Sequence, residues 1–207
     1  MAVKDKRAQE KPLVTESRQQ ILDAALMLFT QKGYSATTVR EIVRAAGVTA
    51  PSLYYYFGNK EGLFLELMQA HCAMIDSALE KQIDASASAS DRLKWLVDII
   101  FLHVIEDKNF FRLMFSIYYG PPQGAPYCDF IVYHVKFHAA IKTIIEQGIA
   151  ANEFLPGNAG HMTWIIRGVV QLAMEEQVKE DRDKIDRQGL QHILDLIIAR
   201  FKKVIPI

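Results

Sequence analysis

Apolar residues recur along this chain at intervals of three and four, and the alternation that is typical of β-strands is nearly absent. The first such pattern runs through Ile21, Leu22 and Ala25. Thr15 can cap the helix that this pattern predicts, and Gly33 can end it because glycine readily takes the left-handed conformation. The spacing therefore predicts a helix over about 15–32, behind a charged leader.

Two short helices are predicted next. Thr37 or Thr38 can cap the first, and Gly47 marks the turn that ends it. Thr49 can cap the second, with Pro51 in its first turn, where the missing N–H breaks no hydrogen bond.

A longer helix is predicted from a cap at Asn59 towards Gln82, and the stretches "DASASASD", "YYGPPQGAP" and "NEFLPGN" then interrupt the helical pattern. The expected fold class is all-α. A flexible leader (1–14) precedes a three-helix helix-turn-helix head (15–60), which a long helix joins to a larger helical bundle (61–207). Further helices are predicted over 91–106, 108–119, 127–152, 159–180 and 186–203.

Charge is distributed unevenly, although the formal net charge is zero. Residues 1–60 hold nine Lys/Arg against five Asp/Glu, whereas 61–207 hold fifteen against nineteen. This asymmetry indicates a basic head on a mildly acidic body. The two cysteines, Cys72 and Cys128, are too few for a disulfide framework, and the charged N-terminus does not resemble a signal peptide. We expect a soluble, cytoplasmic protein.

The two short helices and the turn at Gly47 form a helix-turn-helix pattern, in which the second helix reads the DNA major groove. This reader would span about Ala50–Tyr56. Burial of Leu53 and Phe57, spaced four residues apart, would turn the hydroxyl groups of the opposite side outward, where they can bond phosphates or base edges. The residues predicted on that side are Thr49, Ala50, Ser52, Tyr54, Tyr55 and Tyr56.

Lys60 stands in the first turn of the predicted long helix, where a cation opposes the helix dipole. A phosphate bound there would meet both the ammonium and unpaired backbone N–H groups, so we interpret Lys60 as a DNA contact. Arg40 and Arg44 either reach phosphate or lie on a solvated surface. The basic side chains of the leader either follow DNA or belong to a disordered tail.

The segment "TESRQQILDAALMLFTQKGY…TTVREI…AGV…LYYYFGNKE" resembles the DNA-binding domain of the tetracycline-repressor (TetR) family of bacterial transcriptional regulators, over about residues 15–70. The resemblance implies a homodimer that binds an operator and is released by a small ligand. Tyr56, where the family often has histidine, and Gly58 depart from its pattern. Residues at DNA-contacting positions of the family are Thr38, Thr49, Pro51, Ser52, Tyr54, Tyr55, Tyr56 and Lys60.

Large aromatic and amphipathic side chains crowd the region 95–174. Most of these belong to the core of any helical bundle, but together they leave irregular gaps, and the resemblance implies a ligand cavity among the middle helices. We therefore expect a hydrophobic or aromatic effector. The candidate pocket residues are Trp95, Phe101, Phe111, Phe115, Tyr118, Phe130, Tyr133, His134, Phe137 and Trp164.

His134 and His138, four residues apart on one predicted helix, are the best candidates for metal ligands, but only Cys128 stands near them and its spacing is awkward. A polar contact in the pocket or at the surface fits them better. We therefore predict no metal and no cofactor.

The last two predicted helices carry apolar faces that either pack within the chain or form a two-fold dimer contact, which the resemblance favours. The candidate interface residues are Ile165, Val169, Leu172, Leu190, Leu194 and Ile197.

An enzyme is disfavoured, because neither a nucleophile–histidine–acid arrangement nor a phosphate-binding loop stands out. The sequence predicts a homodimeric repressor of a palindromic operator that a hydrophobic or aromatic small molecule releases. A transcriptional activator and a DNA-binding module without a ligand are the alternatives.

Overall fold

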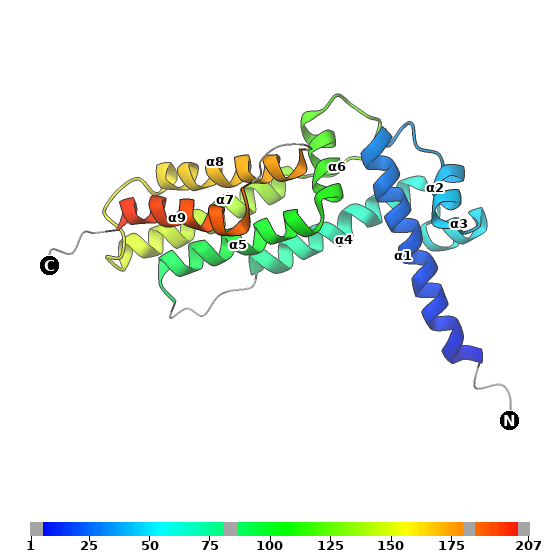
Figure 1. Ribbon diagram of the computed structural model, residues 1–207, viewed down its shortest axis with the longest axis horizontal. Helices are drawn as coiled ribbons and strands as arrows, with labels where there is room; N and C mark the ends of the chain where they lie inside the picture. Colours follow the sequence, from blue (N-terminus) through cyan, green and yellow to red (C-terminus); the bar gives the residue numbers. More distant parts are fainter. Residues whose placement is uncertain (1–5, 81–86, 180–184, 203–207) are drawn as a thin grey trace. The chain divides into compact units, whose positions relative to one another are not determined.

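The computed structural model describes residues 6–80, 87–179 and 185–202, and within these ranges the chain forms nine α-helices (Figure 1). The expected all-α class is confirmed. The helices are α1 (Lys6–Lys32), α2 (Val39–Ala46), α3 (Ala50–Phe57), α4 (Lys60–Glu80), α5 (Ala89–Glu106), α6 (Lys108–Tyr119), α7 (Ile131–Ala150), α8 (Ala159–Val178) and α9 (Arg187–Phe201).

The start of α1 differs from the prediction. The helix begins at Lys6, so Thr15 lies inside it and does not cap it, and residues 6–14 of the expected leader are helical. Residues 6–11 are Lys, Arg, Ala, Gln, Glu and Lys, all strong helix formers, whereas Pro12 within the helix disfavours this extension. At its other end α1 stops before Gly33, which has a φ of 82°, as expected.

The chain divides into two compact units. The head unit consists of Met1–Cys72 and Asn109–Cys128, and the body unit consists of Ala73–Lys108 and Asp129–Ile207. This division differs from the expected boundary at residue 60, because α6 and the loop after it belong with the N-terminal helices. The helix α4 contributes residues to both units.

Aromatic rings hold the head unit together. The ring of Phe64 on α4 lies 5.7 Å from that of Phe29 on α1 and 5.1 Å from that of Tyr34, which follows α1. Helix α6 joins through the stacked rings of His71 and Phe110, whose centroids are 4.2 Å apart. The short helices α2 and α3 contact α1 and each other.

In the body unit, α5 packs against α7, α8 and α9 (Figure 1). Its core-facing residues include Leu93, Val97 and Phe101, which are fully buried. The N-terminus of α5 is held by Glu153, whose carboxylate accepts hydrogen bonds from the backbone N–H groups of Ala89 at 2.7 Å and Ser90 at 3.0 Å. Burial raises the pKa of Glu153, but its hydrogen bonds with Ser90 and Ala89 outweigh this effect and the pKa lies below its ordinary value.

Candidate nucleic-acid interface

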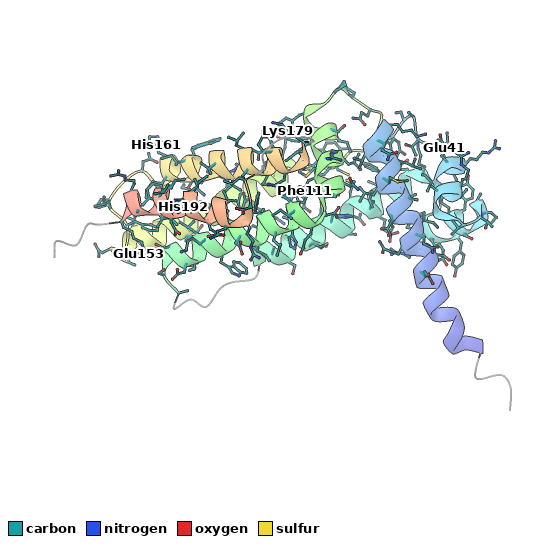
Figure 2. All side chains as sticks on the ribbon, viewed as in Figure 1. Glu41, Phe111, Glu153, His161, Lys179 and His192 are labelled. Carbon is teal, nitrogen blue, oxygen red and sulfur yellow. The ribbon has the colours of Figure 1, made fainter. Side chains whose placement is uncertain are left out.

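Helix α2 begins with a capping box. The Oγ1 atom of Thr38 accepts a hydrogen bond from the backbone N–H of Glu41 at 3.3 Å, and the Glu41 carboxylate accepts one from the backbone N–H of Thr38 at 2.9 Å. Lys32 also donates to Glu41, which is labelled on α2 in Figure 2. The hydrogen bonds from Lys32 and then Thr38 lower the pKa of Glu41 to about 2. The predicted cap at Thr38 is therefore confirmed.

A tight turn connects α2 to α3. Gly47 takes the left-handed conformation with a φ of 67°, and the N–H of Val48 donates to the carbonyl of Val43 at 3.0 Å. Thr49 precedes α3 in the extended conformation, and its hydroxyl lies 2.9 Å from that of Ser52 instead of capping the backbone. The predicted helix-turn-helix is thus present.

Helix α3 has one buried and one exposed side. Leu53 and Phe57 are 0% and 7% exposed, as the four-residue spacing predicts. On the other side Tyr54 is 51% exposed and Tyr55 is 81% exposed, whereas Tyr56 is half-buried and packs against Tyr55 with ring centroids 5.1 Å apart. This side of α3 therefore presents the rings and hydroxyls of Tyr54 and Tyr55 to solvent.

The remaining predicted DNA contacts lie around this surface. Thr38, Thr49 and Pro51 are exposed, whereas Ala50 and Ser52 are half-buried. Arg40 and Arg44 are exposed on α2, which leaves both interpretations of their role open.

Lys60 has a structural role that its sequence position does not reveal. Its ammonium donates to the backbone carbonyls of Tyr34 and Thr37, both at 2.9 Å, and lies 4.1 Å from the centroid of the Tyr34 ring. The two carbonyls stabilise the ammonium in the first turn of α4, so no bound anion is needed to explain its position. This corrects the argument from the sequence, which considered the helix dipole alone and invoked a bound phosphate. An ammonium has three N–H donors, so one remains for a phosphate. Burial lowers the pKa of Lys60.

The candidate pocket residues are divided between the two units. Phe111, Phe115 and Tyr118 belong to the head unit, and the other seven belong to the body unit. Phe101 and Phe130 are buried in packed surroundings. Tyr133 and Phe137 on α7 are half-buried.

Two tryptophans of the candidate pocket lie at the surface of the body unit. Trp95 lines an open groove of about 500 Å³ between α5 and α9, together with Lys94, Asp98, Arg187, Gln188 and Gln191. Trp164 is 65% exposed. Most of the Trp164 side chain therefore faces solvent in a single chain, and its place in a ligand pocket stays a prediction.

His134 and His138 contact different partners on α8. The Nδ1 atom of His134 lies 3.1 Å from a guanidinium nitrogen of Arg167, which can only donate. Burial, and second the charge of Arg167, lower the pKa of His134. The ring of His138 lies 5.6 Å from that of Trp164. Within the described residues, no three His, Cys, Asp or Glu side chains are grouped as metal ligands would be.

The candidate interface residues differ in exposure. Ile165 and Leu172 on α8 are 50% and 59% exposed, and Val169 and Ile197 are half-buried. Leu190 and Leu194 are 1% and 0% exposed and pack into the chain's own core. The sequence could not separate these two sets, because both have the spacing of an apolar helical face. Among the helices that the structure describes, none combines the length and the apolar composition that a membrane span needs.

Comparison with known proteins agrees with this geometry. Residues 21–67 match the family described as "Bacterial regulatory proteins, tetR family". The chain is 42% identical over 91 residues to the HTH-type transcriptional regulator AcrR of Shigella flexneri, a match that covers 44% of this chain and 41% of AcrR. It is 33% identical over 111 residues to the HTH-type transcriptional activator FasR of Mycolicibacterium smegmatis, covering 53% of this chain and 51% of FasR. The matched segment thus spans about half the length of these relatives.

Solved structures resemble the chain over most of its length. The ketosteroid transcriptional regulator KstR2 of Mycobacterium tuberculosis has a TM-score of 0.69 at 21% identity, with 90% of this chain and 95% of KstR2 covered. The transcriptional regulator FadR of Bacillus subtilis, solved in complex with stearoyl-CoA, has a TM-score of 0.62 at 23% identity, with 88% and 98% covered. At these identities the likeness establishes the fold. The match of residues 21–67 shows in addition that the head resembles the N-terminal domain of tetR-family regulators.

Proposed function

We propose that this chain is a transcriptional regulator that binds double-stranded DNA through α3. The observation that carries the proposal is the exposed side of this helix, where Tyr54 and Tyr55 stand beside the paired hydroxyls of Thr49 and Ser52. An α-helix fits the major groove, which is about 12 Å wide, and hydroxyl groups can bond both base edges and phosphates. The capping box of α2 and the left-handed Gly47 support this role, because they hold the helix pair in a defined arrangement.

The proposed regulator is a homodimer. Exposed apolar side chains gather on α8 as Trp164, Ile165 and Leu172, and Leu196 is exposed on α9. A two-fold contact would remove this apolar surface from water and would also present two copies of α3. Readers of this kind bind half-sites about 34–36 Å apart, so we expect a palindromic operator.

The proposed effector is a small hydrophobic or aromatic molecule that binds the body unit and lowers DNA affinity. Support comes from the aromatic residues Tyr133 and Phe137 on α7 and from two structural neighbours. One neighbour is titled a ketosteroid regulator, and the other was solved with stearoyl-CoA. A ketosteroid is largely apolar, and stearoyl-CoA carries a long apolar acyl chain on a charged coenzyme A group. Repression is the expected outcome of operator binding, and the relative FasR, named as an activator, makes activation the alternative.

In vitro selection tests the proposal. The full-length chain would be mixed with a pool of random DNA duplexes, and bound duplexes would be recovered and amplified over several rounds. We expect enrichment of a two-fold symmetric sequence whose binding weakens steeply with salt, because phosphate contacts release counterions. A pool that stays random after selection, with binding no tighter than to unrelated DNA, would contradict the proposed function.

A further inference from the structure

The loop between α6 and α7 folds back onto the end of α6. The side-chain amide of Gln123 donates to the hydroxyl of Ser116 at 2.6 Å and to its backbone carbonyl at 3.3 Å. The backbone N–H of Gly120 donates to the same carbonyl at 3.1 Å. Since Ser116 belongs to the last turn of α6, the position of Gln123 follows the position of this helix.

The same loop contacts the turn between α1 and α2. The hydroxyl of Ser35 donates to the backbone carbonyl of Gln123. Gly124 has a φ of 63°, and a Cβ atom there would lie 2.7 Å from the Ser35 hydroxyl oxygen. Gly33 has a φ of 82°, and a Cβ atom there would lie 2.8 Å from Oε1 of Gln123. The loop and the turn approach this closely because both positions are glycines.

The α1–α2 turn leads directly to the helix-turn-helix. The hydroxyl of Thr37 donates to the carbonyl of Gly33 at 2.8 Å, and Lys60 bonds the carbonyls of Tyr34 and Thr37. Thr38, the next residue, caps α2. The turn therefore transfers any displacement of Ser35 to the start of α2, which holds α3 through the short turn at Gly47.

Docking of the loop leaves one polar atom unsatisfied. Oε1 of Gln123 is buried, and no hydrogen-bond donor among the described residues reaches it. Buried acceptors are nearly always paired in native proteins, because an unpaired acceptor loses its hydrogen bonds to water. Opening the loop would hydrate this atom, which favours the open state, whereas the hydrogen bonds of Gln123 and Ser35 favour the docked state. The two states therefore differ little in free energy.

We propose that Gln123 and Ser35 are positioning residues for DNA binding, and that the loop Gly120–Pro126 acts as a latch on the α1–α2 turn. The docked latch holds α2 and α3 in the arrangement that binds DNA, which reduces the conformational entropy lost on binding. Undocking lowers DNA affinity while the helices stay folded. This inference rests on the proposed function, since it concerns the affinity of the same DNA surface.

A reversible cross-link tests the latch within one molecule. In a chain with Cys72→Ser and Cys128→Ser, the substitutions Ser35→Cys and Gly124→Cys place two thiols across the contact. The 2.7 Å distance from a Cβ at Gly124 to the Ser35 oxygen places the two Cβ atoms at most about 4.1 Å apart, below the upper limit of about 4.5 Å for disulfides. Oxidised glutathione forms the cross-link by accepting the two electrons and two protons of the thiols, and dithiothreitol reverses it.

The duplex selected by the wild-type chain serves as the DNA probe. We expect the oxidised form to bind it about tenfold more tightly than the reduced form, a difference of about 1.4 kcal/mol. Equal affinities or weaker binding after oxidation would each overturn the proposed latch.

A side chain at position 124 is strained, because Gly124 has a φ of 63°. A second pair of variants therefore tests the latch if the disulfide does not form or the cross-linked chain does not fold. Gln123→Ala removes the ties to Ser116, and Gln69→Ala is its control, because Gln69 is an exposed glutamine of the head unit on α4. We expect Gln123→Ala to weaken specific binding about tenfold at a temperature where circular dichroism shows it fully folded, and Gln69→Ala to bind normally.

The two proposals fail in different ways. If the wild-type chain selects no duplex, the proposed function is wrong. If it selects one and Gln123→Ala binds it as tightly as Gln69→Ala does, only the latch is wrong.

Discussion

Replacing Lys60 by methionine would remove the ammonium and keep most of the aliphatic side chain. The variant loses two hydrogen bonds of 2.9 Å to the carbonyls of Tyr34 and Thr37. Hydrogen bonds of a charged group contribute about 1.5–3 kcal/mol each when buried, but Lys60 is only half-buried and water can replace part of this bonding. We therefore expect a total loss of about 2 kcal/mol in the free energy of unfolding of the chain.

Thermal unfolding followed by circular dichroism measures this loss. For a chain of this size, about 2 kcal/mol corresponds to a decrease in Tm of about 4–8 °C. The matched control is Lys142→Met on α7, because Lys142 is exposed and makes only a 3.5 Å ion pair with Glu146 one helical turn away. Such surface pairs contribute about 0.3–0.5 kcal/mol. A Tm for Lys60→Met within about 2 °C of the control would refute a structural role for this lysine.

Three further predictions concern DNA contact, dimerisation and acid stability. Tyr55→Phe removes one hydroxyl per subunit, and at about 0.5–1.5 kcal/mol per subunit it should weaken operator binding by the dimer about tenfold in a fluorescence anisotropy titration. The control is Tyr127→Phe, which changes an equally exposed tyrosine outside α3 and should bind normally. Ile165→Glu combined with Leu172→Glu should give monomers in light scattering and reduce operator affinity at least a hundredfold, because bivalent binding is lost; an unchanged dimer would place the interface elsewhere. Since the pKa of Glu41 is lowered to about 2, its contribution to stability is fully present above its ordinary pKa of 4.5 and disappears as the pH falls to about 2. Urea titrations should therefore show wild type more stable than Glu41→Gln near pH 7 and equal near pH 2, and a difference independent of pH would contradict this assignment.

The helix-turn-helix could be predicted because its signals are local. Thr38 caps α2 through Glu41 three residues away, Gly47 ends α2, and Leu53 and Phe57 share one face of α3. Each of these features depends on neighbours within one helical turn, so the sequence alone contains them. The start of α1 at Lys6 could not be predicted, because Pro12 and the possible cap at Thr15 both indicate a later start.

Contacts between distant residues could not be predicted in this way. Ser35 and Gln123 are 88 positions apart, and Lys60 bonds carbonyls 26 and 23 positions earlier. Backbone carbonyls carry no sequence signal, because every residue has one. The burial of residues on α9 could not be predicted either. An apolar helical face has the same sequence pattern whether it packs inside the chain, as Leu194 does, or faces solvent.

Site-specific photocross-linking tests the central claim that α3 contacts DNA. The photoreactive amino acid p-benzoylphenylalanine would replace Tyr55 in one preparation and Tyr127 in another, and each would be irradiated with the selected duplex. The two tyrosines are 81% and 83% exposed, so both positions should accept the larger side chain. We predict that the chain substituted at 55 cross-links to bases within each half-site and that the chain substituted at 127 does not. Cross-linking from position 127 with none from position 55 would contradict the assignment of α3 as the DNA-binding helix.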